Sequence, residues 1–467
     1  MTSSPATRGR LSACLAALGL ALIAGTSTVA AQPPPIDDTF LPPGGPAAPL
    51  EPTTQRQACT AGAASEELDP AAVPQAAQSL RYETAWPFAR GRGQVVAVID
   101  TGVAPHPRLP GLIAGGDFVG TGDGTSDCDA HGTLVAGIIA ATSSPTDAFS
   151  GVAPDARILS IRQSSLKFGQ SARADENSYQ SENSTGTVTT LAMAVRRAAD
   201  LGATVINISE VACVPARLAL EDRSLGAALR YAVETRDVVV VAAAGNAAAQ
   251  GMCRQNPGAS PRDGGLPDWD APLTIATPAW YDDLVLSVAA VDARGAPAEF
   301  TLNGPWVDIA APGTGIVSLD PASDSLADAL AHQDETGAVQ LSRIAGTSYA
   351  APFVAGTAAL VRERFPELSA REVVERIVAT AHAPAEGWNP TLGHGIVDPV
   401  AAVTAGPGAL SPAVDKAAYP GKAAQPIDAP RMSGDADGLA ATIAVVVAFG
   451  LAMATTIALL VTGRRRE

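Results

Sequence analysis

Four residues along the chain carry the functional groups that a serine nucleophile needs for acyl transfer. Asp100 ends the apolar run QVVAVID, His131 lies in DAHGTLVAG, Asn246 follows VVVVAAAG, and Ser348 lies in AGTSYAAPFVAG. A carboxylate can orient an imidazole, the imidazole can take the proton of a hydroxyl, and an amide N–H can stabilise the oxyanion that forms. We therefore predict that Asp100, His131 and Ser348 are catalytic and that Asn246 lines an oxyanion hole.

Each of these residues alone has a plainer explanation. A serine before a helix is most often an N-cap, and an aspartate after a strand often caps the following turn. A lone histidine ahead of a helix is more often structural, and Gly245 with Asn246 is a turn signal. The combination, in the chain order Asp, His, Asn, Ser, favours catalysis over these alternatives.

The elements that must position these residues can be predicted from apolar periodicity. Short apolar runs without inside–outside alternation predict buried strands, and the longer patterns between them have helical spacing. Strands that alternate with helices indicate an α/β fold with a mainly parallel sheet covered on both faces, whose strand ends hold ligands. The predicted strands cover residues 94–100, 157–162, 203–209, 237–244, 280–291 and 306–310, and the predicted helices cover residues 133–141, 187–201, 225–235 and about 348–365.

Both ends of the chain have the composition of membrane-directed segments. Arg8 and Arg10 precede a short apolar run and small residues, which predicts a signal peptide over residues 1–31; an uncleaved anchor is the alternative. Residues 438–463 carry no charge and are followed by three arginines, which predicts one transmembrane helix with residues 464–467 as a cytoplasmic tail. A buried core helix is the alternative for this second segment.

Composition divides the rest of the chain. Residues 32–79 are rich in proline and predict an extended N-terminal arm, residues 80–405 have a globular pattern, and residues 406–437 are an Ala- and Pro-rich linker. The polar stretch 163–186 interrupts the globular pattern and predicts a mobile surface loop. The net charge of −16 argues against a nucleic-acid partner and is interpreted as a solvated acidic surface.

The cysteines indicate disulfides in an exported protein. Cys14 falls in the predicted signal peptide, which leaves Cys59, Cys128, Cys213 and Cys253. Four cysteines outside the cytoplasm predict two disulfides, in any of three pairings. A zinc site is the alternative, but the chain has no CxxC or HxxH spacing, and we predict neither a metal nor a cofactor.

The segments around the four candidate residues resemble subtilisin-like serine proteases. DTGV, HGTLVAG, GVAPDARI, AAGN, DIAAPGTGI and GTSYAAPFVAG match segments of that family in the same order, over about residues 95–403. The resemblance implies the three-layer subtilisin-like fold. It also implies that Ser348 attacks the scissile carbonyl, His131 transfers the proton, Asp100 orients the imidazole, and Asn246 with the Ser348 N–H binds the oxyanion. No acidic cluster clearly matches a calcium site of the family.

The whole architecture resembles one branch, the mycosins, which are membrane-anchored proteases of actinobacterial type VII secretion systems. This implies a catalytic domain on the outer side of the cell membrane that processes secreted protein substrates and stabilises the secretion complex by contacting its channel proteins. A structural subunit with dispensable catalysis is the alternative. The resemblance also implies the pairings Cys59–Cys128 and Cys213–Cys253, and with them an arm that stabilises the enzyme and is not a removable inhibitor.

Two departures from the family pattern concern the substrate cleft. Tyr349 follows Ser348 where relatives usually have methionine, and Phe353 stands where they usually have histidine. Ser209 and Glu210 are the predicted substrate-binding residues, and Glu210 begins the segment Glu-Val-Ala where many relatives have Leu-Gly-Gly. A side chain in place of glycine narrows the cleft, which predicts slow and selective cleavage.

Overall fold

The computed structural model describes residues 32–170, 185–218, 220, 222–248, 253–258, 268–333 and 338–406. The predicted signal peptide, the transmembrane segment and tail, nearly all of the linker, and residues 171–184 of the polar stretch lie outside these ranges. Within them, no helix combines the length and the apolar character needed to cross a membrane.

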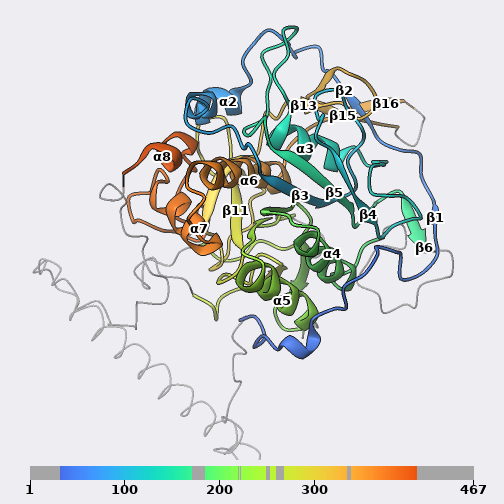
Figure 1. Cartoon of the computed structure of the whole chain (residues 1–467), viewed down its shortest axis with the longest axis vertical. Coiled ribbons are helices and arrows are strands. Elements are labelled where there is room, and N and C mark those ends of the chain that lie inside the picture. The colour runs from blue at the N-terminus through green and yellow to red at the C-terminus, as the bar shows by residue number, and fades with distance from the viewer. Residues whose placement is uncertain are drawn as a thin grey trace, which may run out of the picture. The chain divides into compact units, whose positions relative to one another are not determined.

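A seven-stranded sheet forms the centre of the fold, in the order β12-β11-β9-β7-β3-β5-β4 (Figure 1). Every neighbouring pair in it is parallel. The side chains of its inner strands are buried on both faces, as the uninterrupted apolar runs predict. The strands are β3 Val95–Asp100, β4 Ile113–Asp117, β5 Arg157–Arg162, β7 Val205–Ile208, β9 Val239–Ala243, β11 Leu286–Val291 and β12 Ile309–Pro312.

Helices cover both faces of this sheet, which confirms the predicted three-layer α/β fold (Figure 1). One layer contains α3 (His131–Ala140) and α6 (Thr347–Arg364), and the other contains α4 (Val188–Asp200) and α5 (Arg223–Arg230). Helix α6 is buried from Thr347 to Val361, because its residues are small or apolar around its whole circumference. Two shorter helices, α7 (Ala370–Ala379) and α8 (Pro399–Thr404), pack beside it.

Two predicted strands are wrong in their limits. The strand expected over residues 280–291 begins only at Leu286, because Trp280 and Tyr281 form a turn and donate hydrogen bonds to the buried carboxylate of Asp222. The strand expected over residues 306–310 is shifted to Ile309–Pro312. Helix α5 begins two residues earlier than predicted and continues as a π-helical turn, Tyr231–Thr235.

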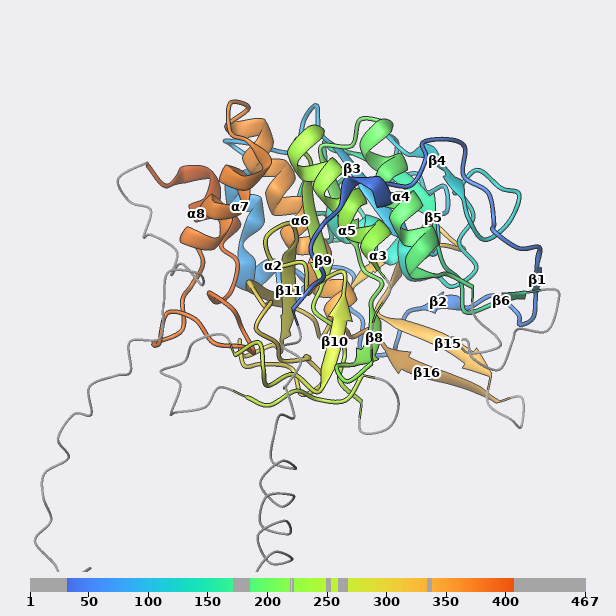
Figure 2. The same ribbon diagram turned by 90° about the horizontal axis from the view of Figure 1, so that it is seen from below.

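Several short elements were not predicted, although α7 begins with the capping box of Ser369 and Glu372, which is a sequence signal of a helix start. Strand β4 contains two glycines and was not predicted, and neither were α7, α8 and the small antiparallel sheets at the edge of the domain. In one of these, β8 (Ala212–Pro215) pairs with β10 (Thr274–Thr277). In another, β15 (Ala329–Gln333) lies between β16 (Val339–Arg343) and β2 (Ala61–Ala63) (Figure 2).

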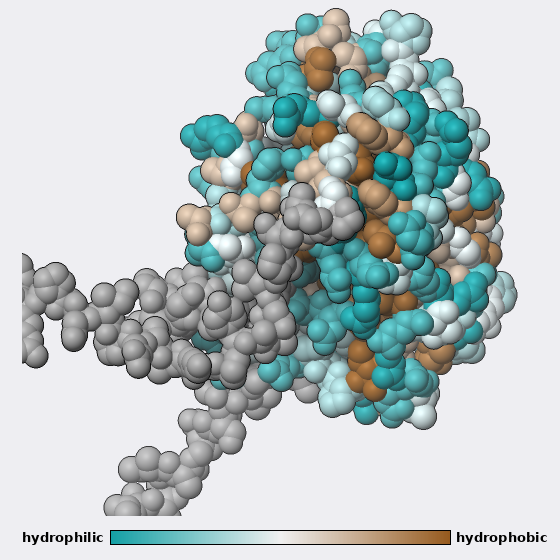
Figure 3. All heavy atoms as spheres, turned by 60° about the vertical axis from the view of Figure 1, so that its left-hand side comes forward, coloured by the Kyte–Doolittle hydropathy of each residue, from teal (hydrophilic) through white to brown (hydrophobic). Residues whose placement is uncertain are grey.

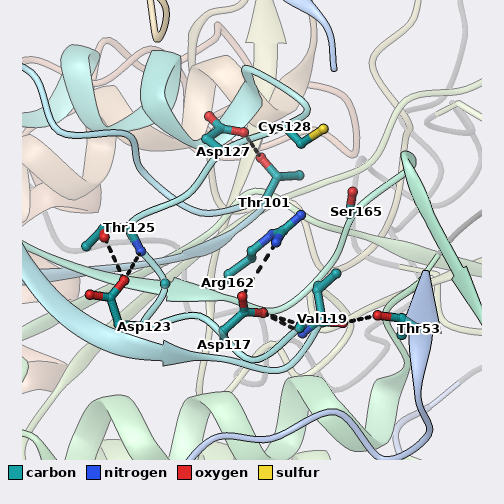
Figure 4. A network of polar contacts seen from close by, with 12 residues as sticks. Thr53, Thr101, Asp117, Val119, Asp123, Thr125, Asp127, Cys128, Arg162 and Ser165 are labelled. Atoms are coloured by element: carbon teal, nitrogen blue, oxygen red, sulfur yellow. Dashed lines mark hydrogen bonds and ion pairs between the residues drawn. The ribbon is translucent and has the colours of Figure 1, made fainter. Parts of the chain in front are cut away.

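The N-terminal arm is attached to the domain at several separate places. Strand β1 (Thr53–Gln55) pairs with β6 (Phe168–Gln170), and β2 pairs with β15. The Thr53 hydroxyl donates to the Val119 carbonyl, in a turn that Asp117 organises by accepting two backbone N–H groups (Figure 4). Part of the stretch predicted as a mobile loop is therefore a strand that holds the arm.

Two disulfides add covalent links, Cys59–Cys128 and Cys213–Cys253. These are the pairings that the resemblance implies. The first joins the arm to the segment just before α3, and the second joins β8 to the chain that follows β9. Exposed apolar side chains are interspersed among polar ones on the face that Figure 3 shows, which agrees with a solvated surface.

Candidate active site

The carboxyl ends of three neighbouring strands carry the predicted site residues. Asp100 ends β3, Ser209 directly follows β7, and Asn246 lies three residues after β9. Helix α3 begins at His131, and Ser348 is the second residue of α6. Because the strands are parallel and adjacent, their ends meet at one edge of the sheet, where ligands bind in open α/β folds.

Asp100 and His131 form a hydrogen-bonded pair. The distance between Asp100 Oδ1 and His131 Nδ1 is 2.7 Å, and the Asp100 side chain is fully buried while 20% of the His131 side chain is exposed. The Thr101 N–H donates to the same Oδ1 at 2.7 Å. A buried carboxylate at Nδ1 fixes the tautomer that leaves Nε2 free to accept a proton.

Asp127, which the sequence analysis missed, ties α3 to β3. Its carboxylate accepts the Thr101 hydroxyl at 2.9 Å (Figure 4). It also accepts the Thr133 N–H at 2.9 Å and the Thr133 hydroxyl at 2.7 Å. Burial raises the pKa of Asp127 to about 6, against the opposing effect of the Thr133 hydrogen bonds. The close approach also requires glycine at position 132, since a Cβ there would lie 2.1 Å from the Gly102 carbonyl oxygen. His131 is therefore held at a fixed place relative to Asp100.

Asn246 is oriented by Thr347. Its side-chain oxygen accepts the Thr347 N–H at 2.9 Å and the Thr347 hydroxyl at 3.0 Å, and that hydroxyl also accepts the Gly245 N–H at 3.2 Å. Both contacts use Oδ1 as the acceptor, so the amide nitrogen of Asn246 points away from Thr347. An added Cβ on Gly346 would lie 3.0 Å from Ser348 Oγ and 3.3 Å from Asn246 Nδ2, so these two groups border the same small space.

Ser209 anchors the helix of Ser348 by binding a backbone carbonyl that has no partner within the helix. Pro352 lacks an N–H, so the Ser348 carbonyl has no partner four residues along the helix. The Ser209 hydroxyl fills this place, donating to the Ser348 carbonyl oxygen at 2.7 Å, and it accepts from the Asn207 amide at 2.9 Å. Residue 209 thus supports the nucleophile's backbone from the end of β7. The sequence predicted Ser209 as a substrate-binding residue but gave no sign of this contact.

Comparison with known proteins places the chain in a family. The sequence model of the subtilase family, Peptidase_S8, matches residues 91–395. Mycosin-4 of Mycobacterium tuberculosis is 50% identical over 404 residues, which cover 85% of this chain and 84% of that protein. The chain belongs to the mycosins, within the subtilase family. It is therefore a subtilisin-like serine endopeptidase.

Solved structures of other mycosins share this fold. The MycP3 protease of the ESX-3 type VII secretion system matches with a TM-score of 0.75 and 46% identity, covering 80% of this chain and all of that one. A chain in the intact ESX-5 inner membrane complex matches with a TM-score of 0.75 and 43% identity, covering 93% of this mycosin and 100% of that chain.

The electrostatics of this mycosin's site centre on His131. Burial lowers the pKa of the imidazole, but the charge and hydrogen bond of Asp100, followed by the charges of Glu210 and Asp127, outweigh burial and raise it to about 9. Tyr349 covers the imidazole, with ring centroids 4.9 Å apart, and is itself buried. The aromatic residue that replaces the family's methionine therefore packs directly on the general base.

Glu210 joins Asp100 and His131 in a cluster that spacing along the chain does not reveal. One side-chain ligand atom of each residue lies within 4.8 Å of the other two. Two ligands of one zinc ion, at about 2.0–2.1 Å from the metal, lie roughly 3.3 Å apart in tetrahedral geometry. The distance between Asp100 Oδ1 and His131 Nδ1 is 2.7 Å, which is that of a hydrogen bond and too short for two such ligands.

Proposed function

We propose that this endopeptidase cleaves peptide bonds with Asp100, His131 and Ser348 as its triad. The Asp100–His131 pair carries the proposal, because a buried carboxylate at 2.7 Å is the group that stabilises an imidazolium during proton transfer. In the first step Ser348 Oγ attacks the scissile carbonyl while His131 Nε2 takes its proton. His131 then returns the proton to the leaving amine, and water hydrolyses the acyl-enzyme in the same way.

Two donors stabilise the oxyanion in this proposal. The Asn246 amide nitrogen borders the same space as Ser348 Oγ, and the Ser348 N–H lies in the first turn of α6, where backbone donors lack intrahelical partners. The positive end of the helix dipole adds to the stabilisation of a negative charge there. Both donors are in place before the substrate binds, which is what makes such interactions effective.

A fluorophosphonate probe tests the triad. Wild-type enzyme is expected to be labelled at Ser348, and Ser348→Ala is expected to stay unlabelled. Ser143→Ala, at an exposed serine beyond the C-terminal end of α3, serves as the matched control and is expected to label like wild type. An unlabelled wild-type enzyme, or equal labelling of Ser348→Ala, would contradict the assignment.

We further propose that the protein is a membrane-anchored component of a type VII secretion complex. Similarity over 93% of the chain to a protein in an intact ESX-5 inner membrane complex supports this. Residues 1–31 would be the signal peptide, residues 438–463 the single membrane span, and the catalytic domain would lie on the extracytoplasmic side. We expect that only detergent extracts the protein from membranes and that protease added outside the cell digests the catalytic domain. A catalytic domain in the cytoplasm would refute this topology.

Two roles in that complex can be separated in cells. In the first, the enzyme processes secreted protein substrates; in the second, it stabilises the complex and catalysis is dispensable for assembly. The altered strand end at Glu210 and Val211 supports selective cleavage, so slow hydrolysis of casein is expected. If Ser348→Ala restores the complex in a deletion strain but leaves a secreted protein unprocessed, both roles are present. If it restores neither, assembly depends on catalysis.

The N-terminal arm is proposed to stabilise the enzyme. The Cys59–Cys128 bond and the pairing of β2 with β15 support an arm that stays attached after any cut within it. No cofactor is required by the proposed chemistry. Activity that arises only after loss of residues 32–75 would contradict this role and identify the arm as an inhibitor.

A further inference from the structure

Glu210 lies beside the catalytic pair, just after the end of β7. It follows Ser209 at the end of β7, and the side chain of Ser164, which follows β5, is close enough to lower the pKa of its carboxyl. In the sheet β3 lies between β7 and β5, so the Glu210 side chain reaches across the end of β3, where Asp100 is. The ligand atoms of Glu210, Asp100 and His131 lie within 4.8 Å of one another. The Glu210 carboxylate therefore lies beside the general base of the proposed triad.

The site has more negative charge than its own residues balance. Asp100, Asp127 and Glu210 act on His131, Asp129 acts on Glu210, and the three aspartates have dedicated donors. Asp100 accepts the Thr101 N–H and the imidazole, Asp127 accepts from Thr101 and Thr133, and Asp129 accepts from Ser165 and the Leu166 N–H. Glu210 has the Ser164 hydroxyl, and within the described ranges no lysine or arginine forms an ion pair with it.

This environment makes the ionised form of Glu210 costly in the free enzyme. Burial, and after it the charge of Asp100, raise the pKa of Glu210 to about 7, although His131 opposes the shift. A carboxylate in such a place is stabilised by a cation that brings hydrogen-bond donors to it. The side chain is partly exposed and so remains within reach of a bound peptide.

We propose that Glu210 selects substrates with a lysine or arginine side chain close to the scissile bond. The ammonium or guanidinium group of the substrate binds the Glu210 carboxylate as an ion pair, which no lysine or arginine of the described residues forms with it. The interaction forms where the reacting bond is positioned, so it affects kcat/KM. This inference rests on the proposed triad, because it assumes that substrate lies over His131 and Ser348.

Paired peptides test the selection. Internally quenched peptides are built on a bond that the detergent-extracted full-length enzyme is found to cut in casein, with lysine, norleucine or glutamate placed in turn at each residue near the bond. For at least one position, wild type is expected to prefer lysine over norleucine by about tenfold or more in kcat/KM, the ratio that 1.4 kcal/mol represents. Glu210→Gln is expected to reduce this ratio to about one, and Glu210→Lys to favour glutamate over lysine at the same position.

The concentration of active enzyme is determined by fluorophosphonate titration, so that loss of folding in a variant is not mistaken for loss of selectivity. Labelled wild-type enzyme without a lysine preference at any position would overturn the proposal and leave the triad standing. An equal lysine preference in wild type and Glu210→Gln would also overturn it, by assigning the preference to another residue. Failure of wild type to label would overturn the triad, and this inference with it.

Discussion

Replacing Asn246 by aspartate isolates the oxyanion donor from the structural role of the same side chain. Aspartate keeps an oxygen that can accept the Thr347 N–H and hydroxyl, the contacts that Asn246 Oδ1 makes at 2.9 and 3.0 Å. It replaces the amide nitrogen, which faces the space beside Ser348 Oγ, by a second oxygen that cannot donate when ionised. The local fold is thus retained while one of two proposed donors is lost.

The expected loss of kcat follows from the loss of one of the two oxyanion donors. One oxyanion donor is typically worth about 10²–10³ in kcat, or about 2.7–4 kcal/mol of transition-state stabilisation. Asn246→Asp is expected to lose at least this much, because its negative charge also repels the developing oxyanion. KM is expected to change little, since the oxyanion does not exist in the bound substrate.

Steady-state kinetics on one quenched peptide, with Thr347→Val as the control, measure this effect. Valine keeps the Thr347 N–H that donates to Asn246 Oδ1 but removes the hydroxyl, which donates to the same oxygen and accepts the Gly245 N–H, so it is expected to reduce stability by about 1–3 kcal/mol. Its kcat is expected to stay within about tenfold of wild type, below the loss from a missing donor. A kcat of Asn246→Asp within tenfold of wild type would refute the oxyanion assignment. An equal loss of kcat in Thr347→Val and Asn246→Asp would refute it as well.

Two further predictions concern the pH profile and the arm. Acylation requires neutral His131, so kcat/KM is expected to rise with pH through the imidazole pKa, which nearby carboxylates raise to about 9. Glu210→Gln removes one of these charges and is expected to shift this limb of the kcat/KM profile to lower pH; an unchanged midpoint would contradict the coupling. The double substitution of Cys59 and Cys128 by serine opens a bridge with a sequence separation of 69, which in the chain-entropy model stabilises by about 4 kcal/mol. Denaturant unfolding is expected to show a loss of that order with kcat retained, whereas unchanged stability would indicate that strand pairing alone holds the arm.

The sequence predicted much of the fold because buried parallel strands are uninterrupted apolar runs. The strand ending at Asp100 and the strand over Arg157–Arg162 have the predicted ends, and the helix beginning near Ser348 was recognised from its small residues. Periodicity does not predict a conformation that is set by a hydrogen bond to a distant side chain. Trp280 and Tyr281 have strand-forming residue types, but their hydrogen bonds to Asp222, far away in sequence, hold them in a turn.

The candidate site was predicted from sequence as a set of residue types but not as an arrangement. Asp100, His131, Asn246 and Ser348 could be named because their segments occur together in one order, although each residue alone has a plainer explanation. The cysteine count allowed three disulfide pairings, and only the resemblance to relatives selected one. Asp127, Thr347 and the contact from Ser209 to the Ser348 carbonyl had no such pattern, since each depends on two segments that meet only in the folded chain.

The sequence by itself determined the reaction class, because hydrolysis by a serine needs a few residue types in local settings that short segments encode. The tertiary structure decided the electrostatics around them. Glu210 is two residues beyond the end of β7 in the sequence, but in the fold it reaches across the end of β3 to Asp100 and His131. Charge interactions depend on distances in space and on burial, and both are fixed only when the sheet brings the strand ends together.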